Sequence, residues 1–174
     1  LLPSTAWKKR AYKRPEQQKW YAGETISLGI GQGYNNFTML QMATAVATLA
    51  TGGQRFKPRL VRDIEDVISH ERRRIANDAL QPLPLRPEHV DLIRNAMNGV
   101  TREGTSRAAF AAAGYQSGGK TGTAQAVGLK AGERYSAIKA DERKRDHSLY
   151  VAFAPLEAPT VALAVVVENA GFGS

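Results

Sequence analysis

The spacing of apolar residues predicts a buried helix in the first third of the chain. From residue 38 to residue 50 apolar side chains recur at helical positions and cover most of the surface, so we expect this helix in the core. Thr38 and Gln41 have the separation of a capping box, which indicates the first turn. Gly52 and Gly53 favour an end directly afterwards, because glycine adopts the left-handed conformation at little cost.

Two further helices are predicted in the middle of the chain. The first begins at Pro87, since proline suits the first helical position, and runs to about Asn98. A shorter helix follows over residues 106–113 and ends at Gly114. The apolar residues that recur at helical spacing in and just after the first of these helices are Val90, Ile93, Met97 and Val100.

Strands are predicted before and after these helices. Residues 60–64 have the pattern of a short strand, and we interpret Arg72-Arg73-Arg74 as the solvated tip of a hairpin. The last third of the chain reads as sheet, because β-branched and aromatic residues predict strands over residues 115–127, 148–154 and 160–168. Residues 155–159 connect the last two strands over a length typical of a hairpin, so we expect these two strands to pair.

Composition excludes several classes of protein. The 174 residues are 43% hydrophobic and 23% charged, which is typical of one globular domain. There is no cysteine, so disulfides, thiolate metal ligands and a cysteine nucleophile are excluded. The histidines (His70, His89 and His147) are far apart and near no carboxylate pattern, so we expect no metal and no cofactor.

The net charge of +8 is partly concentrated at the start of the chain. Residues 1–22 combine basic and aromatic side chains and show no clear period. A nucleic-acid surface has this composition, but no known nucleic-acid-binding module accompanies it. We therefore interpret the segment as a solvated loop anchored by its tryptophans, and expect no nucleic-acid partner.

Glycine-rich segments suggest two nucleotide sites, and both suggestions are weak. Residues 29–34 contain G-x-G-x-G after a weak strand pattern at residues 26–28, but Asn36 stands where a dinucleotide fingerprint needs its third glycine. Residues 114–121, from Gly114 to Thr121, match the phosphate-binding loop G-x-x-x-x-G-K-[ST] in full. That motif needs a strand before it and a helix after it, whereas here a helix precedes and a strand follows. A phosphate-binding loop remains a remote alternative.

Lys120 also begins the sequence Lys120-Thr121-Gly122, the K-T-G of penicillin-binding proteins and serine β-lactamases. The chemistry requires an edge strand, along which an extended peptide can pair through its main chain. The lysine supplies positive charge for a substrate carboxylate and for proton movement. The threonine hydroxyl can bind the same carboxylate, and the glycine lets the ligand approach the strand closely.

Longer blocks around this motif carry a more specific resemblance. They occur in one order along nearly the whole chain, at residues 20–26, 29–34, 119–125, 145–147, 153–155 and 167–169. With these blocks the chain resembles the class B penicillin-binding proteins, and among them the penicillin-binding protein 2 group of the cell-elongation system. The resemblance implies an α+β fold, the penicillin-binding and serine β-lactamase-like transpeptidase fold, with helices packed against an antiparallel sheet and only its C-terminal half in these residues.

The resemblance also implies an activity and its residues. Such enzymes attack the D-Ala-D-Ala end of a peptidoglycan stem peptide with a serine, form an acyl-enzyme, and transfer the acyl group to an amine of a second stem. Lys120, Thr121, Gly122 and Thr123 would bind the substrate, with Lys120 also catalytic. The backbone amide of Thr123 would be one donor of the oxyanion hole.

The nucleophilic serine is expected outside this chain. It should open an S-x-x-K motif on a helix, and neither formal match fits. Ser117–Lys120 contains paired glycines, and Ser136–Lys139 follows the K-T-G instead of preceding it. We therefore expect residues 1–174 to be the C-terminal portion of a single transpeptidase domain, inactive alone and lacking the half with the nucleophile.

By the same resemblance, the partners would be peptidoglycan stem peptides, β-lactams, a membrane glycan polymerase and proteins of the elongation complex. A membrane anchor would lie outside these residues, with the catalytic domain on the periplasmic side of a bacterial inner membrane. Two alternatives share the fold: a hydrolase of the serine β-lactamase type, and a sensor domain without catalysis.

Overall fold

The computed structural model describes residues 2–128 and 141–173, and it divides into two compact units. The first unit contains residues 2–39, 122–128, 141–149 and 166–173, and the second contains residues 40–121 and 150–165. Among the described residues a three-stranded sheet has the order β5-β6-β7, formed by β5 (Gly118–Ala124), β6 (His147–Ala154) and β7 (Val161–Val167). The three strands predicted for the last third of the chain are confirmed.

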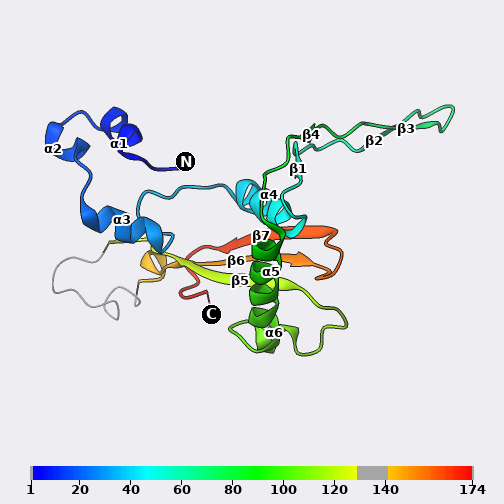
Figure 1. The fold of residues 1–174 in the computed structure, drawn as a ribbon. Coiled ribbons are helices and arrows are strands. Elements are labelled where there is room, and N and C mark those ends of the chain that lie inside the picture. Colours follow the sequence, from blue (N-terminus) through cyan, green and yellow to red (C-terminus); the bar gives the residue numbers. More distant parts are fainter. Residues whose placement is uncertain (1, 129–140, 174) are drawn as a thin grey trace. The chain divides into compact units, whose positions relative to one another are not determined.

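The first unit begins with three helices: α1 (Thr5–Ala11), α2 (Pro15–Gln18) and α3 (Ala22–Gly29), which follow one another in Figure 1. The interpretation of residues 1–22 as a loop was therefore wrong, and so was the weak strand at residues 26–28. The first two helices are too short to display a period, and their signals are local. Ser4 Oγ accepts a hydrogen bond from the Trp7 amide, and Pro15 occupies the first turn of α2.

A buried lysine holds these helices together. The side chain of Lys8 is 3% exposed, and its Nζ donates to the Glu24 carboxylate and, at 2.7 Å, to the Lys19 carbonyl. The ammonium group also lies within 6.0 Å of the ring centroids of Trp20, Tyr21 and Tyr34. A buried charge is costly unless paired and hydrogen-bonded, so this arrangement ties α1 to α3.

Acid should weaken this tie. The Lys8 ammonium, and after it the Tyr21 backbone amide, lower the pKa of Glu24 below its ordinary value of 4.5. The ionised carboxylate is therefore favoured in the folded state, and this contribution to stability is lost as pH falls through the lowered pKa. We expect Glu24→Gln to be less stable than wild type at pH 7 but to lose less stability between pH 5 and pH 3. Urea unfolding followed by tryptophan fluorescence measures both, and parallel pH profiles would contradict the assignment.

The second unit is built on α4 (Met39–Ala50), α5 (Pro87–Arg102) and α6 (Arg107–Phe110). The predicted helix at residues 38–50 is confirmed, and Gly52 and Gly53 follow it with φ of 71° and 102°. The next helix runs to Arg102, beyond the predicted end at Asn98. The third occupies only residues 107–110 of the predicted 106–113.

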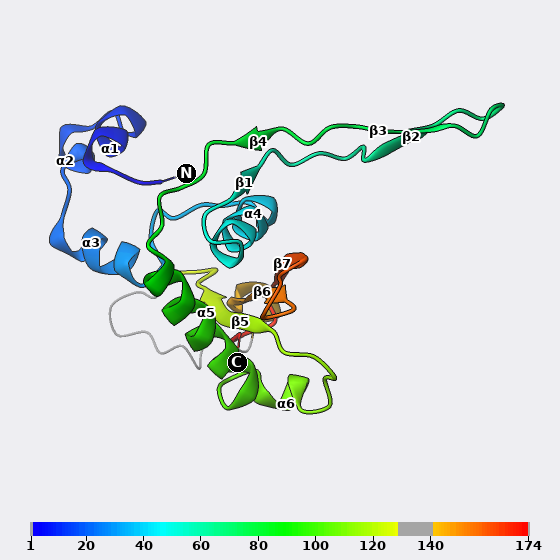
Figure 2. The same cartoon turned by 45° about the vertical axis from the view of Figure 1, so that its right-hand side comes forward.

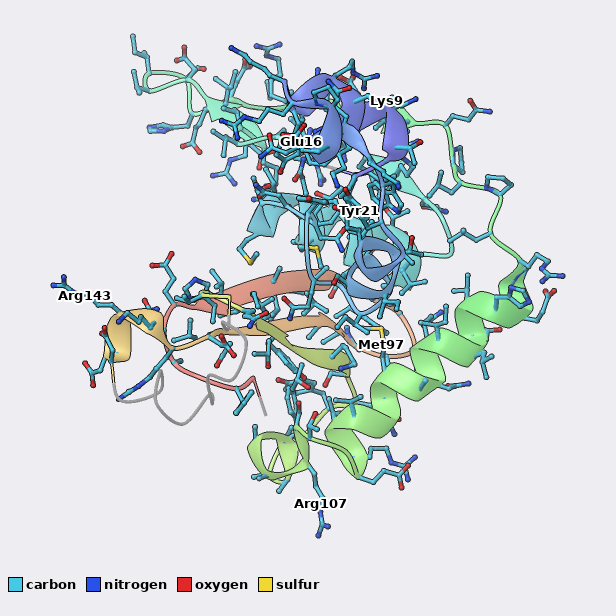
Figure 3. The ribbon with its side chains drawn as sticks, turned by 90° about the vertical axis from the view of Figure 1, so that its left-hand side faces the viewer. Lys9, Glu16, Tyr21, Met97, Arg107 and Arg143 are labelled. Atoms are coloured by element: carbon cyan, nitrogen blue, oxygen red, sulfur yellow. The ribbon has the colours of Figure 1, made fainter. Side chains whose placement is uncertain are left out.

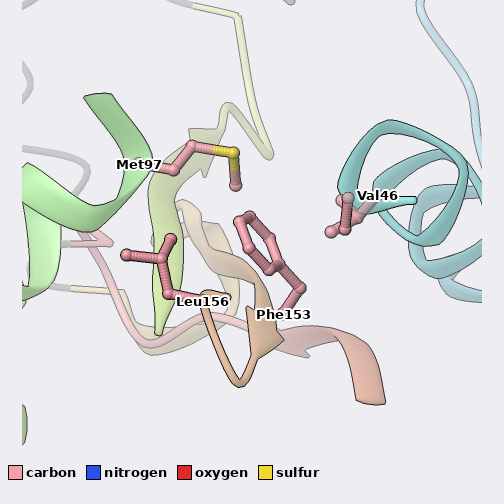
Figure 4. Packing of buried hydrophobic residues seen from close by; sticks show 5 residues of the cluster. Val46, Met97, Phe153 and Leu156 are labelled. Atoms are coloured by element: carbon pink, nitrogen blue, oxygen red, sulfur yellow. The ribbon is translucent and has the colours of Figure 1, made fainter. Parts of the chain in front are cut away.

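The core of the second unit gathers around Phe153, which is 1% exposed and lies between Met97 of α5 and Val46 of α4 in Figure 4. Ala50 and Leu156 complete the buried cluster. The expected burial of the helix at residues 38–50 is thus confirmed on the face that carries Val46 and Ala50. Ile93 was expected on the apolar face of α5 but is 44% exposed.

A long hairpin connects α4 to α5, and Figure 2 shows its two arms running side by side. Near its base β1 (Arg55–Phe56) pairs with β4 (Ala79–Leu80), and farther out β2 (Asp63–Glu65) pairs with β3 (Arg72–Arg74). The arginine run was predicted at the hairpin tip, and that prediction was wrong, because Arg72–Arg74 form strand β3. Its neighbours across the ladder explain this, because Arg72 and Arg74 lie opposite Glu65 and Asp63.

Candidate functional site

Strand β5 has a strand neighbour on one edge only within the described residues, because the sheet order is β5-β6-β7. Its register with β6 follows from two glycines. A Cβ on Gly118 would lie 2.5 Å from the Phe153 ring, and a Cβ on Gly122 would lie 3.3 Å from Leu149 Cβ. Gly118 faces Phe153 and Gly122 faces Leu149, so higher residue numbers in β5 lie opposite lower numbers in β6, and the two strands are antiparallel.

Lys120 is exposed on this strand, and its Nζ donates to the Thr121 carbonyl at 2.7 Å. The side chain is therefore available to a ligand at the surface. Because residues 118–124 form a strand, the glycines, lysine and threonine of the G-x-x-x-x-G-K-[ST] match do not form a loop leading into a helix. The phosphate-binding alternative is wrong for this reason.

The same geometry removes Ser117 as a nucleophile. Ser117 is only 3% exposed, and its backbone carbonyl accepts hydrogen bonds from Asn98 Nδ2 at 2.9 Å and Thr101 Oγ1 at 3.0 Å. Ser117 and Lys120 also do not share a helical turn, as S-x-x-K requires. The other formal match, Ser136–Lys139, lies outside the described residues.

The two threonines of the strand are oriented by their hydroxyls. Thr121 Oγ1 lies 3.1 Å from Thr105 Oγ1, in the segment between α5 and α6. Thr123 Oγ1 accepts from the Gly173 amide at 3.1 Å. The sequence did not identify Thr105 as part of the site. The only signal was its position just after the end of a helix, which does not show a contact with β5.

The Thr123 main chain has a further partner in the glycine-rich segment after α3. Gln32 Nε2 donates to the Thr123 carbonyl at 2.6 Å, and Gln32 Oε1 accepts from the Gln125 amide at 3.3 Å. The sequence left Gln32 without a role, and the only local signal was the glycine on each side of it. The structure thus brings Gln32 to the strand that carries Lys120-Thr121-Gly122.

Hydrogen bonds also organise the end of β5 and the start of β6. His147 Nδ1 accepts from the Asn169 amide at 2.9 Å, and Asn169 Nδ2 donates to the Arg145 carbonyl at 3.0 Å. Asp146 Oδ1 accepts from the Ala126 amide at 3.2 Å. These bonds anchor His147 at the start of β6. The short 3₁₀ helix before it, residues Glu142–Lys144, carries Arg143, which projects outward in Figure 3.

Two other kinds of site have no candidate in the described part of the chain. No group of His, Asp and Glu residues there is placed to hold a metal ion. No helix there is long and apolar enough to cross a membrane. The chemistry that the arrangement does offer is an edge strand with an exposed cation and hydroxyls beside it, suited to an extended peptide that ends in a carboxylate.

Comparison with known proteins shows which family the chain is similar to. Residues 9–174 match the family described as the penicillin binding protein transpeptidase domain. The chain is 38% identical over 184 residues to peptidoglycan D,D-transpeptidase MrdA of Escherichia coli strain K12, covering 99% of this chain and 27% of that protein. It is 30% identical over 153 residues to penicillin-binding protein 2A of Bacillus subtilis strain 168, covering 84% of this chain and 20% of that one.

Solved structures agree with the sequence matches. The crystal structure of Pseudomonas aeruginosa PBP2 in complex with WCK 5153 superposes with a TM-score of 0.73 at 33% identity, covering 99% of this chain and 34% of that one. A second structure shows how a peptidoglycan synthase complex coordinates polymerization and crosslinking. It superposes with a TM-score of 0.69 at 32% identity, covering 99% of this chain and 26% of that one. The chain spans about 27% of the length of the MrdA relative. On sequence and fold together, the chain belongs to the penicillin-binding protein transpeptidase domain family.

Proposed function

We propose that this chain is the C-terminal portion of the transpeptidase domain of a peptidoglycan D,D-transpeptidase of the penicillin-binding protein 2 type. The observation that carries the proposal is the placement of Lys120-Thr121-Gly122 on an edge strand of the sheet, with Lys120 exposed. The MrdA relative bears this activity in its name and matches 99% of the chain. β-Lactams, which imitate the end of the stem peptide, would bind at the same strand.

In this function each residue of the strand has a task. Lys120 attracts the terminal carboxylate of the stem peptide and supports proton transfer at the nucleophile. The Thr121 hydroxyl, oriented by Thr105, binds the same carboxylate. Gly122 carries no side chain, so the substrate can approach the strand closely. The Thr123 amide donates to the oxygen of the scissile carbonyl. Removing one such donor costs on the order of 3 kcal/mol of transition-state stabilisation.

The reaction then needs a serine that we place outside residues 1–174. Its hydroxyl oxygen forms a bond to the penultimate D-Ala carbonyl carbon, the amide bond to the last D-Ala breaks, and that D-Ala leaves with the proton. An amine of a neighbouring stem attacks the ester carbonyl carbon, the bond to the serine oxygen breaks, and the serine takes up the proton that the amine releases. The buried Ser117 supports this placement, since it cannot reach a substrate at the strand edge.

The setting of the enzyme is part of the proposal. A relative was solved within a peptidoglycan synthase complex that combines polymerization and crosslinking. We place this chain in a similar assembly with a membrane glycan polymerase and other proteins of the elongation system. The catalytic domain would lie on the periplasmic side of a bacterial inner membrane, held by an anchor outside these residues.

The nucleophile can be located directly. The full-length protein is labelled with a fluorescent penicillin, digested, and the acylated peptide identified by mass spectrometry. We expect the acyl group on a serine outside residues 1–174, within an S-x-x-K sequence. An adduct on Ser117, or on any other serine of this chain, would contradict our placement. Rapid turnover of the penicillin in place of a stable adduct would favour a hydrolase of the β-lactamase type.

A further inference from the structure

The edge of β5 is occupied at one point by a side chain. The Gln32 carboxamide donates to the Thr123 carbonyl at 2.6 Å and accepts from the Gln125 amide at 3.3 Å. These two backbone groups stand on either side of Ala124 and face the same edge of the strand. A carboxamide carries the donor and acceptor of a peptide group, so Gln32 supplies what one peptide of a neighbouring strand would supply.

The backbone beneath Gln32 is held in place. Its amide donates to the Ser27 carbonyl at 2.9 Å, and the Gly31 amide donates to the Leu28 carbonyl at 3.0 Å. Those bonds form a Schellman motif at the end of α3, with Gly31 at the left-handed position, φ 78°. Asn35 Nδ2 donates to the Gln32 carbonyl at 3.1 Å. Gln32 therefore reaches the strand from a fixed turn.

Thr123 is thereby held at two points, one on its main chain and one on its side chain. Its carbonyl is bound by Gln32, and its side-chain Oγ1 accepts from the Gly173 amide. The N–H and C=O of one strand residue point to the same edge. The contact with the carbonyl consequently limits rotation of the residue whose amide must aim at a reacting oxygen.

We propose that Gln32 is a positioning residue for acyl transfer, an inference that rests on the function proposed above. It holds Thr123 so that its amide points along the substrate edge, and it closes that edge at Gln125. An extended substrate can pair with β5 up to Thr123 and no farther. Gln32 acts through Thr123 and does not touch the reacting atoms.

The test compares Gln32→Ala and Gln32→Glu in the full-length protein. Acylation by a fluorescent penicillin is resolved into the binding constant and the acylation rate constant, from pH 5 to pH 8. We expect Gln32→Ala, which removes both hydrogen bonds, to lower the rate constant about tenfold at every pH, a loss of about 1.4 kcal/mol of transition-state stabilisation, with little change in binding. We expect Gln32→Glu to be slower still at pH 8, where a carboxylate faces the Thr123 carbonyl.

The pH profile separates positioning from a general structural role. As the pH falls toward 5, a growing fraction of the Gln32→Glu carboxyl group is protonated, and this form can donate to the Thr123 carbonyl, so the rate relative to wild type should rise as the pH falls. Gln17→Ala is the matched control, since Gln17 is exposed on α2, and it should acylate as wild type does.

Each outcome decides between the two proposals. Wild-type rate constants in both Gln32 variants, or equal losses that do not depend on pH, would overturn the positioning role and leave the proposed function standing. A wild-type protein that no penicillin labels would overturn the proposed function, and the role of Gln32 with it.

Discussion

Lys120→Ala should largely abolish labelling of the full-length protein by a fluorescent penicillin, while the protein stays folded. The side chain is exposed, and its one described hydrogen bond is to the adjacent Thr121 carbonyl, so its loss leaves no cavity. In the proposed site it supplies the positive charge that attracts the substrate carboxylate and assists proton transfer. We expect the acylation rate to fall by a factor on the order of 10² or more.

Two comparisons make this result specific. Lys9→Ala removes an exposed lysine from α1 and should label like wild type. Lys120→Arg keeps the charge on a longer, planar group. It should retain binding better than acylation, because the guanidinium group stays protonated and cannot take part in proton transfer. Normal labelling of Lys120→Ala would show that the Lys120-Thr121-Gly122 match is coincidental.

Gly118→Ala should be strongly destabilising, although it adds a single methyl group. The new Cβ would lie 2.5 Å from two atoms of the Phe153 ring and 3.2 Å from Met97 Cβ. Phe153 is 1% exposed at the centre of the core and has little room to move. Overpacking of this kind costs about 1–3 kcal/mol. Thermal unfolding of the full-length protein measures the loss.

Gly114→Ala is the matched control, because a Cβ on Gly114 would meet no atom within 4 Å. Its melting temperature should stay close to that of wild type. Equal melting temperatures for the two alanine variants would mean that β5 does not approach Phe153 as closely as the structure shows.

The elements that could be predicted from sequence are those with a repeated pattern. α4, α5 and the three sheet strands are long enough for their patterns to show, and the family resemblance supplied the α+β fold. α1 and α2 were missed because helices of one or two turns leave only capping signals. The arginine run was misplaced because its position depends on the acidic residues opposite it, which a pattern along one segment does not show.

The candidate site divides in the same way. Lys120, Thr121 and Gly122 are contiguous, so the sequence alone was enough to find them, and the flanking pattern predicted a strand. Thr105 and Gln32 reach that strand from other parts of the chain, Gln32 from far away in sequence. Such contacts are made by tertiary folding, and the glycines beside Gln32 indicated only a turn.

β7 has a consequence for how this polypeptide behaves in solution. Alternate residues of the strand are exposed by 39–60%, and all of them are apolar: Val161, Leu163, Val165 and Val167. β7 is also the far strand of the sheet, with no partner on its outer edge among the described residues. An uncharged edge of this kind is a template for intermolecular pairing. The 174-residue chain, produced alone, should therefore be colloidally unstable and should form β-rich aggregates at rising concentration.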